Sequence, residues 1–180
     1  MENVNHLEAL QLYAGALKNE GFESHLLNVT EQTPYETLLI ALPMEGHPRG
    51  GLQMELSFMP GMEAQLDGLS ILQCLVPIEE IKANEAELQA TITNINKFCT
   101  LVGFGILSNP HIVYFRHTAM LPADPQQNLQ LITQTTWLIS YLLEMFGPGL
   151  SQIADGSSTT ANAFSGHQFE HLITQDSAVM

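Results

Sequence analysis

The chain is poor in cationic side chains. Of its 180 residues only 5 are Lys or Arg, against 19 Asp or Glu, which gives a formal net charge of −14. A surface of this sign repels the phosphates of nucleic acids and the headgroups of anionic membranes, so neither is an expected partner. The same charge keeps a protein soluble and favours basic partners over acidic ones.

The sequence also lacks a long apolar run and a leader-like beginning. No apolar stretch approaches the roughly 18 residues that span a bilayer. The longest candidate, around Trp137 to Phe146, is interrupted by Ser140 and Glu144. The first residues have no basic region followed by an apolar run, so no targeting segment is expected. These absences predict a cytoplasmic protein.

Cysteine is nearly absent as well. Cys74 and Cys99 are the two cysteines, and neither belongs to a CxxC pair. We interpret them as free thiols inside the fold, which agrees with a reducing compartment.

A capped helix opens the chain. Asn5 is a good N-cap and Glu8 follows three residues later, as in a capping box. Apolar residues then recur at helical spacing up to Leu17. Lys18 suits the last turn and Gly21 provides a left-handed end. We therefore predict a helix from about residue 5 to residue 20.

Strand patterns follow this helix. The clearest is 52–58, in which apolar and polar residues alternate with a period of two. Short links between the predicted strands favour an antiparallel meander. Pro43 and Pro77 are expected to end the second and fourth strands. The four predicted strands cover residues 22–29, 36–42, 52–58 and 69–76.

The second half repeats the mixture of helix and strand. Asn84 and Glu87 form another predicted capping box, for a helix that extends to Cys99. Two strands are predicted at 102–107 and 111–121. A long helix then begins at Asp124 and Pro125 and ends near Phe146, where Gly147-Pro148 is expected to stop it.

The fold class that results is α+β. We predict an antiparallel meander sheet covered by helices, in the order α-β-β-β-β-α-β-β-α. Residues 1–156 are expected to form this domain. Residues 157–180 are expected to be a linker-like tail because the stretch 156–166 is rich in Ser, Thr, Ala and Asn.

No motif points firmly to catalysis. His167, Glu170 and His171 match the H-x-x-E-H string of inverted zinc peptidases, which needs both imidazoles on one helix. Asp176 is the only acid further downstream, so we interpret the string as a polar tail. The glycine-rich stretch 103–108 leads into a strand and not into the helix that a dinucleotide site requires. We predict no catalytic residue, no bound metal and no cofactor.

Three residues are candidates for contact with a partner. Trp137 and Tyr141 lie off the core face of the long predicted helix, which leaves surplus apolar surface. We predict a homodimer with these two residues near the contact. Arg116 follows an apolar run and is either an anchor for a partner's carboxylate or half of an internal salt bridge, with Glu55 as one candidate.

A family resemblance covers roughly residues 5–155. It rests on the short apolar strand Leu38 to Pro43, the alternating strand Leu52 to Phe58, and Asn94-Ile95-Asn96 in the middle helix. The last strand into Arg116, followed by Leu121-Pro122 and a long helix, also fits. The pattern resembles the fold shared by class I type III secretion chaperones and YbjN-type sensory-regulator domains. This resemblance implies a chaperone-like or regulatory module with no catalytic residues.

The sequence is therefore compatible with two functions. The first is a non-enzymatic protein-binding module that holds a segment of another protein, or of a second copy, by apolar contacts. The alternative is a small-molecule sensor or enzyme with a pocket between helix and sheet. The partner or ligand and the pathway stay open, and so does the docking of the tail.

Overall fold

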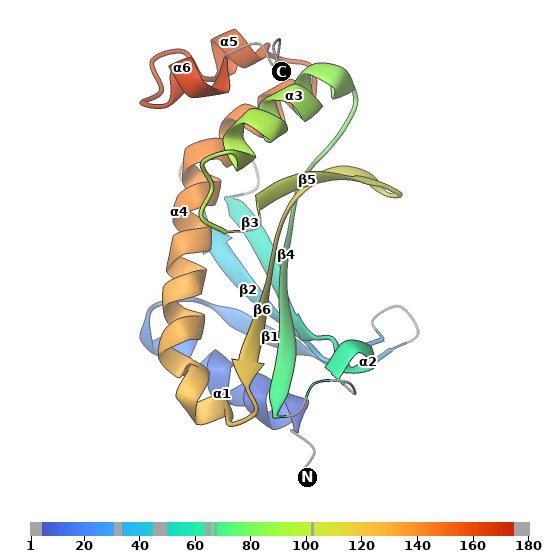
Figure 1. The fold of residues 1–180 in the computed structure, drawn as a ribbon, viewed down its shortest axis with the longest axis vertical. Coiled ribbons are helices and arrows are strands. Elements are labelled where there is room, and N and C mark those ends of the chain that lie inside the picture. Colours follow the sequence, from blue (N-terminus) through green and yellow to red (C-terminus); the bar gives the residue numbers. More distant parts are fainter. Residues whose placement is uncertain are drawn as a thin grey trace. The chain divides into compact units, whose positions relative to one another are not determined.

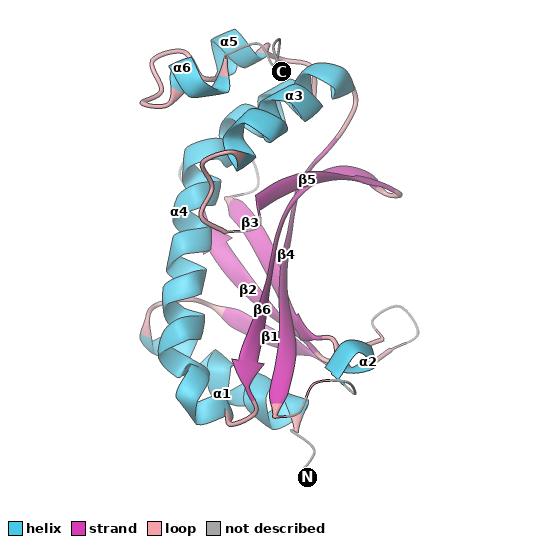
Figure 2. Ribbon diagram, in the orientation of Figure 1, coloured by secondary structure: helices cyan, strands magenta, loops and turns pink. Residues whose placement is uncertain are grey.

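A computed structural model describes residues 5–30, 34–44, 50–63, 66, 68–101 and 103–174. The chain forms two compact units. Unit 1 contains residues 1–76 and 117–141, and unit 2 contains residues 77–116 and 142–180. Figure 1 and Figure 2 show the elements along the chain.

The strands form one antiparallel open sheet, which makes the fold α+β. The strand order is β1-β2-β3-β4-β6-β5, so the first four strands are a meander and β1 and β5 are the two edges. One early prediction was wrong: the fourth strand does not stop at Pro77 but continues through it to Glu80. The strands are β1 (Ser24–Leu27), β2 (Thr37–Pro43), β3 (Gly51–Phe58), β4 (Leu69–Glu80), β5 (Gly103–Ser108) and β6 (His111–Pro122).

In unit 1 the first helix, α1 (His6–Asn19), is capped as its sequence predicts. The Asn5 side chain accepts a hydrogen bond from the Glu8 amide at 3.3 Å. Gly21 adopts a φ of +91°, which ends the helix and turns the chain into β1. The buried face of α1 is formed by Ala9, Leu10, Tyr13 and Leu17.

The core of unit 1 lies between the buried face of α1 and one face of the sheet. The predicted alternation in β3 is confirmed, because Leu52, Met54, Leu56 and Phe58 are all buried. A short helix that the sequence did not predict, α2 (Pro60–Glu63), follows β3. Its Glu63 carboxylate accepts the Ile71 amide at 2.7 Å and lies 2.9 Å from His6 Nε2.

The long helix begins as predicted but ends later. Asp124 accepts the Gln126 amide at 3.0 Å and caps a 3-10 turn, Pro125–Asn128, which leads into α4 (Leu129–Ala154). The predicted stop at Gly147-Pro148 is wrong. Pro148 removes one amide donor, but the carbonyl it leaves unpaired belongs to Glu144, an exposed residue that water can reach.

Unit 2 corrects the second predicted cap. The helix α3 (Glu85–Asn96) ends before Cys99, and Asn84, in a left-handed conformation with φ of 56°, makes no side-chain cap bond. The Glu87 carboxylate instead accepts the Thr160 amide at 2.6 Å, 73 residues away. Glu87 was predicted to cap the start of its own helix at Asn84, but it binds the backbone of a distant segment instead.

The C-terminal segment of unit 2 packs on α3. It contains two short helices, α5 (Thr160–Ala163) and α6 (Glu170–Ile173). The Asn94 amide donates to the Ile173 carbonyl at 3.0 Å, and the hydroxyls of Thr91 and Thr160 lie 2.6 Å apart. Phe164 and Ile173 are fully buried, so this part of the chain is docked up to Thr174.

Aromatic rings fill the space beneath that segment. Phe146 of α4 is at the centre, with ring centroids 5.8 Å from Phe98, 6.0 Å from Phe104 and 6.5 Å from Phe164. We call this set, with Phe169 and His167, the aromatic cluster of unit 2.

None of the helices among the described residues is both long enough and apolar enough to cross a bilayer.

Candidate functional site

The outer side of α4 in unit 1 carries exposed apolar side chains. Trp137 is 52% exposed, Leu138 37% and Tyr141 53%, and the three lie within one turn and a half of helix. The opposite side of the same helix is buried, with Ile132 and Ile139 in the core. We call Trp137, Leu138 and Tyr141 the α4 ridge.

Trp137 is exposed but held in place. Its indole Nε1 donates to the Glu20 carboxylate at 3.3 Å. Its ring centroid lies 4.7 Å from that of Phe22, with the two planes at 59°. Both contacts fix the indole before any partner arrives, which lowers the entropy cost of using it in binding.

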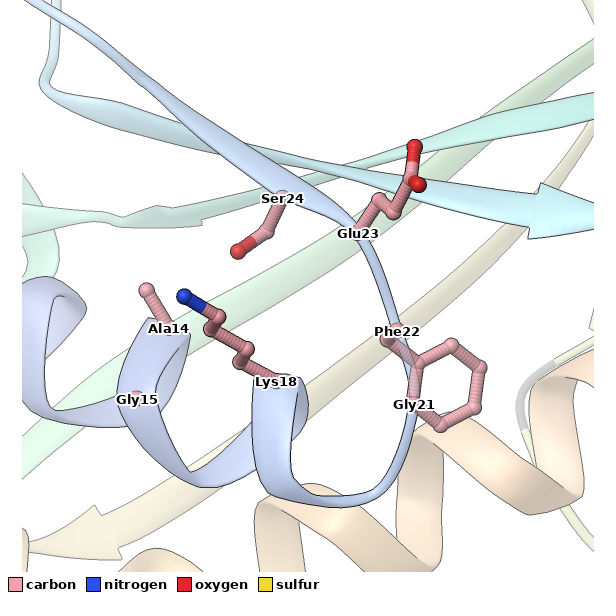
Figure 3. A pocket seen from close by; sticks show the side chains of 7 residues that line it. All are labelled: Ala14, Gly15, Lys18, Gly21, Phe22, Glu23 and Ser24. Atoms are coloured by element: carbon pink, nitrogen blue, oxygen red, sulfur yellow. The ribbon is translucent and has the colours of Figure 1, made fainter.

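A hollow of about 620 Å³ lies between the end of α1 and the start of β1. Figure 3 shows this hollow from close by. It opens to solvent at the edge of the sheet, because β1 is an edge strand. The residues that line it are Ala14, Gly15, Lys18, Gly21, Phe22, Glu23 and Ser24.

Glycine makes this hollow roomy. Gly15 is exposed in the middle of α1, and a Cβ built on it would meet no atom within 4 Å. The same holds for Gly21 in the turn. A glycine in an exposed helix interior costs about 1 kcal/mol relative to alanine, so Gly15 weakens the helix while it keeps the hollow open.

Two polar side chains point into the hollow. Figure 3 shows the Lys18 ammonium and the Ser24 hydroxyl extending into the space between α1 and β1, whereas the Glu23 carboxylate points away. Within the described part of the chain, Lys18 has no ion pair. The hollow therefore presents a cation that no acid among the described residues pairs with.

Phe22 joins the hollow to the α4 ridge. The ring is buried, lines the hollow, and points toward α4, where it contacts Trp137. Phe22 therefore lies between the hollow and the α4 ridge, both within unit 1.

Arg116, the third predicted contact residue, belongs to unit 2. It is exposed, and its guanidinium carbon lies 5.9 Å from the centroid of the Tyr114 ring. The structure gives it no ion pair with Glu55 among the residues it describes. Glu55 itself has a raised pKa, because burial disfavours its charged form.

The H-x-x-E-H string does not form one helical face. His167 precedes α6, and its Nδ1 accepts the Phe169 amide at 3.2 Å. The Glu170 carboxylate accepts the Gly166 amide at 2.7 Å. In the described chain, His, Cys, Asp and Glu residues form no group of three that could hold a metal ion. Asp176 lies outside the described residues.

The cysteines, His117 and the glycine-rich stretch 103–108 also lack the surroundings that would suit them to catalysis or phosphate binding. Burial raises the pKa of Cys74 to about 12 and that of Cys99 to about 11, so both thiols are protonated at neutral pH. Burial lowers the pKa of His117, whose buried Nδ1 has no hydrogen-bond partner among the residues that the structure describes. The glycines at 103–108 lie in β5, which offers no helix N-terminus to a phosphate.

Neither protein-family models nor curated proteins give a match to this chain.

The sequence predicted that Trp137 and Tyr141 lie off the core face of the long helix, but it did not predict the hollow. Lys18 was explained by its position in the last turn of a helix, and the contact between Phe22 and Trp137 joins residues 115 positions apart. One available signal was Gly15, a glycine inside an otherwise well-formed amphipathic helix.

Proposed function

We propose that this protein is a non-enzymatic binding module that holds a segment of another protein on the α4 ridge and the adjoining hollow. The observation that carries the proposal is the pre-arranged, half-exposed Trp137, fixed by Glu20 and Phe22. Trp and Tyr are the residue types that most often dominate binding energy at protein interfaces.

Three further features support this function. The three exposed apolar side chains of the α4 ridge are neighbours. Such a group indicates a contact surface, whereas single exposed apolar residues do not. The resemblance of the sequence to secretion chaperones and YbjN-type domains points to the same class by analogy. The net charge of −14 favours partners whose overall charge is positive.

A second copy of the chain is the other candidate occupant of the ridge. A two-fold contact would bury Trp137 and Tyr141 of both copies, since isologous interfaces use the same patch twice. Sedimentation velocity between 1 and 50 µM separates the cases. A monomer throughout that range would rule out the homodimer and leave another protein as the partner.

Capture from an extract of the source organism tests the main proposal. We expect the wild-type protein to retain specific proteins that Trp137→Ala/Tyr141→Ala does not retain. Met120→Ala is the matched control, because Met120 is 65% exposed on β6 of the same unit but outside the ridge. Equal capture by the double variant, or no capture by the wild type, would refute the proposed function.

A further inference from the structure

Lys18 is the most informative side chain of the hollow. Like the other Lys and Arg side chains that the structure describes, Lys18 has no ion pair among the described residues, and of these cations it is the one that lines the hollow. Its ammonium extends toward β1 and shares the hollow with the Ser24 hydroxyl, as Figure 3 shows. An ammonium and a hydroxyl are both donors from which a carboxylate accepts hydrogen bonds.

We infer that the hollow binds a carboxylate side chain, Asp or Glu, of the partner's bound segment, paired with Lys18 and Ser24. The inference rests on the proposed function and names the chemistry of the segment that occupies the hollow. Long-range attraction still favours a partner that is basic overall, so the expected segment has an acid inside a basic or neutral surrounding.

Gly15 and Gly21 leave room for the partner's Asp or Glu side chain. A Cβ at either position would meet nothing within 4 Å, so space remains between α1 and the turn into β1. Gly21 needs its positive φ for the turn, but Gly15 lies in regular helix, where the fold gains nothing from a glycine. A glycine at this position leaves the wall of the hollow free of any side chain.

A purely structural role for Lys18 predicts something different. A cation in the last turn of a helix, such as Lys18, interacts favourably with the helix dipole. That role changes stability when the charge is removed, but it sets no preference for what binds in the hollow. The two roles are therefore separable by binding specificity.

Selection of phage-displayed random dodecapeptides against the purified full chain tests the inference. We expect peptides enriched on the wild type to share an Asp or Glu and to bind Lys18→Glu at least tenfold more weakly. Selection on Lys18→Glu should instead enrich Lys or Arg at that place. Peptides without a shared acid, or with equal affinity for Lys18→Glu, would overturn the inference, as would a failure to enrich any peptide.

Two helix variants provide the control for access. Gly15→Leu places a side chain in the hollow and should abolish peptide binding, whereas Gln11→Leu, one turn earlier and outside the hollow, should leave it unchanged. Both substitutions favour helix, so loss of folding does not confuse the result. Peptide binding that survives Gly15→Leu would overturn the inference.

A free carboxylate is the competing source of the same chemistry. Titration with succinate, followed by the amide signals of Gly15 and Ser24, should show only millimolar or weaker binding. Tighter binding of succinate than of the selected peptides would overturn the assignment to a partner's side chain. Capture from extract that depends on Trp137 and Tyr141 but not on Lys18 would leave the proposed function standing and remove only this inference.

Discussion

The two units treat their surplus aromatic surface in opposite ways. In unit 2 the rings around Phe146 are covered by the chain itself, through Phe164 and the segment that carries α5 and α6. In unit 1 Trp137 and Tyr141 remain half exposed among the described residues. An apolar surface that its own chain covers contributes to folding, whereas one that is left open and pre-arranged is available for binding.

The polar groups differ in the same sense. In unit 2 Glu87 and Asn94 are matched to backbone groups of the covering segment at 2.6 and 3.0 Å. In unit 1 Lys18 has no ion pair in the described chain and the buried Nδ1 of His117 has no hydrogen-bond partner. Unit 2 also has a buried hydroxyl, that of Ser151, without a hydrogen-bond partner among the described residues, so the difference lies in Glu87 and Asn94, which pair with backbone groups of the segment that covers the unit.

The largest expected difference concerns the aromatic side chains. Phe164→Ala should lower the free energy of unfolding by about 3–5 kcal/mol, because it empties a buried site beneath the C-terminal segment. Trp137→Ala should cost only about 1 kcal/mol, since its side chain is half exposed. Urea unfolding followed by circular dichroism measures both. Equal losses would show that the ridge is part of the core and would break the comparison.

One helical glycine from each unit, Gly15 and Gly149, gives a matched pair of substitutions with opposite expected effects on stability. A Cβ on Gly149 would lie 2.5 Å from the Phe164 ring, so Gly149→Ala should destabilise by about 1–3 kcal/mol. Gly15→Ala meets nothing within 4 Å and should stabilise by about 1 kcal/mol through helix propensity. Thermal unfolding of both variants checks the signs. Stabilisation by Gly149→Ala would contradict the close packing of unit 2.

Glu55 sharpens the comparison through pH. Its pKa is raised in the folded state, so its contribution to stability is fully present below the unfolded value of 4.5 and is lost as pH rises through the folded value. Glu55→Gln should therefore unfold at a higher temperature than the wild type at pH 7, with the gain vanishing below pH 4.5. Glu144→Gln, at an exposed position, is the control and should show no such gain.

His117 should act in the other direction. Burial lowers its pKa, so the neutral ring is favoured in the fold, and stability present above the unfolded value of 6.5 is lost as pH falls below it. His117→Leu should reduce the slope of stability against pH below 6.5. The exposed His25→Leu should leave that slope unchanged. Identical slopes for wild type and His117→Leu would contradict the burial of an unpaired ring nitrogen.

Some elements were predictable because their cause is local. Asn5 caps α1 through a residue three positions away, and the alternation at 52–58 reports directly which side chains face the core. Asp124 and Pro125 start their turn for the same reason. Each of these signals depends only on neighbours in the chain.

Other predictions failed because a distant residue decided the outcome. Glu87 bonds Thr160 and not the start of its own helix. Gly149 lies beside the Phe164 ring, so this glycine next to Pro148 serves packing, and the helix does not stop at Gly147-Pro148. Local patterns do not contain the positions of such partners.

The sequence by itself determined the α+β class, the acidic charge, and the fact that Trp137 and Tyr141 lie off the core stripe of a long helix, because periodicity and composition are properties of the chain. Only the tertiary structure decided that Phe22 and Glu20 fix Trp137 and that Lys18 shares a hollow with Ser24. The physical reason is that burial and pairing depend on which remote segments meet, and folding alone brings them together.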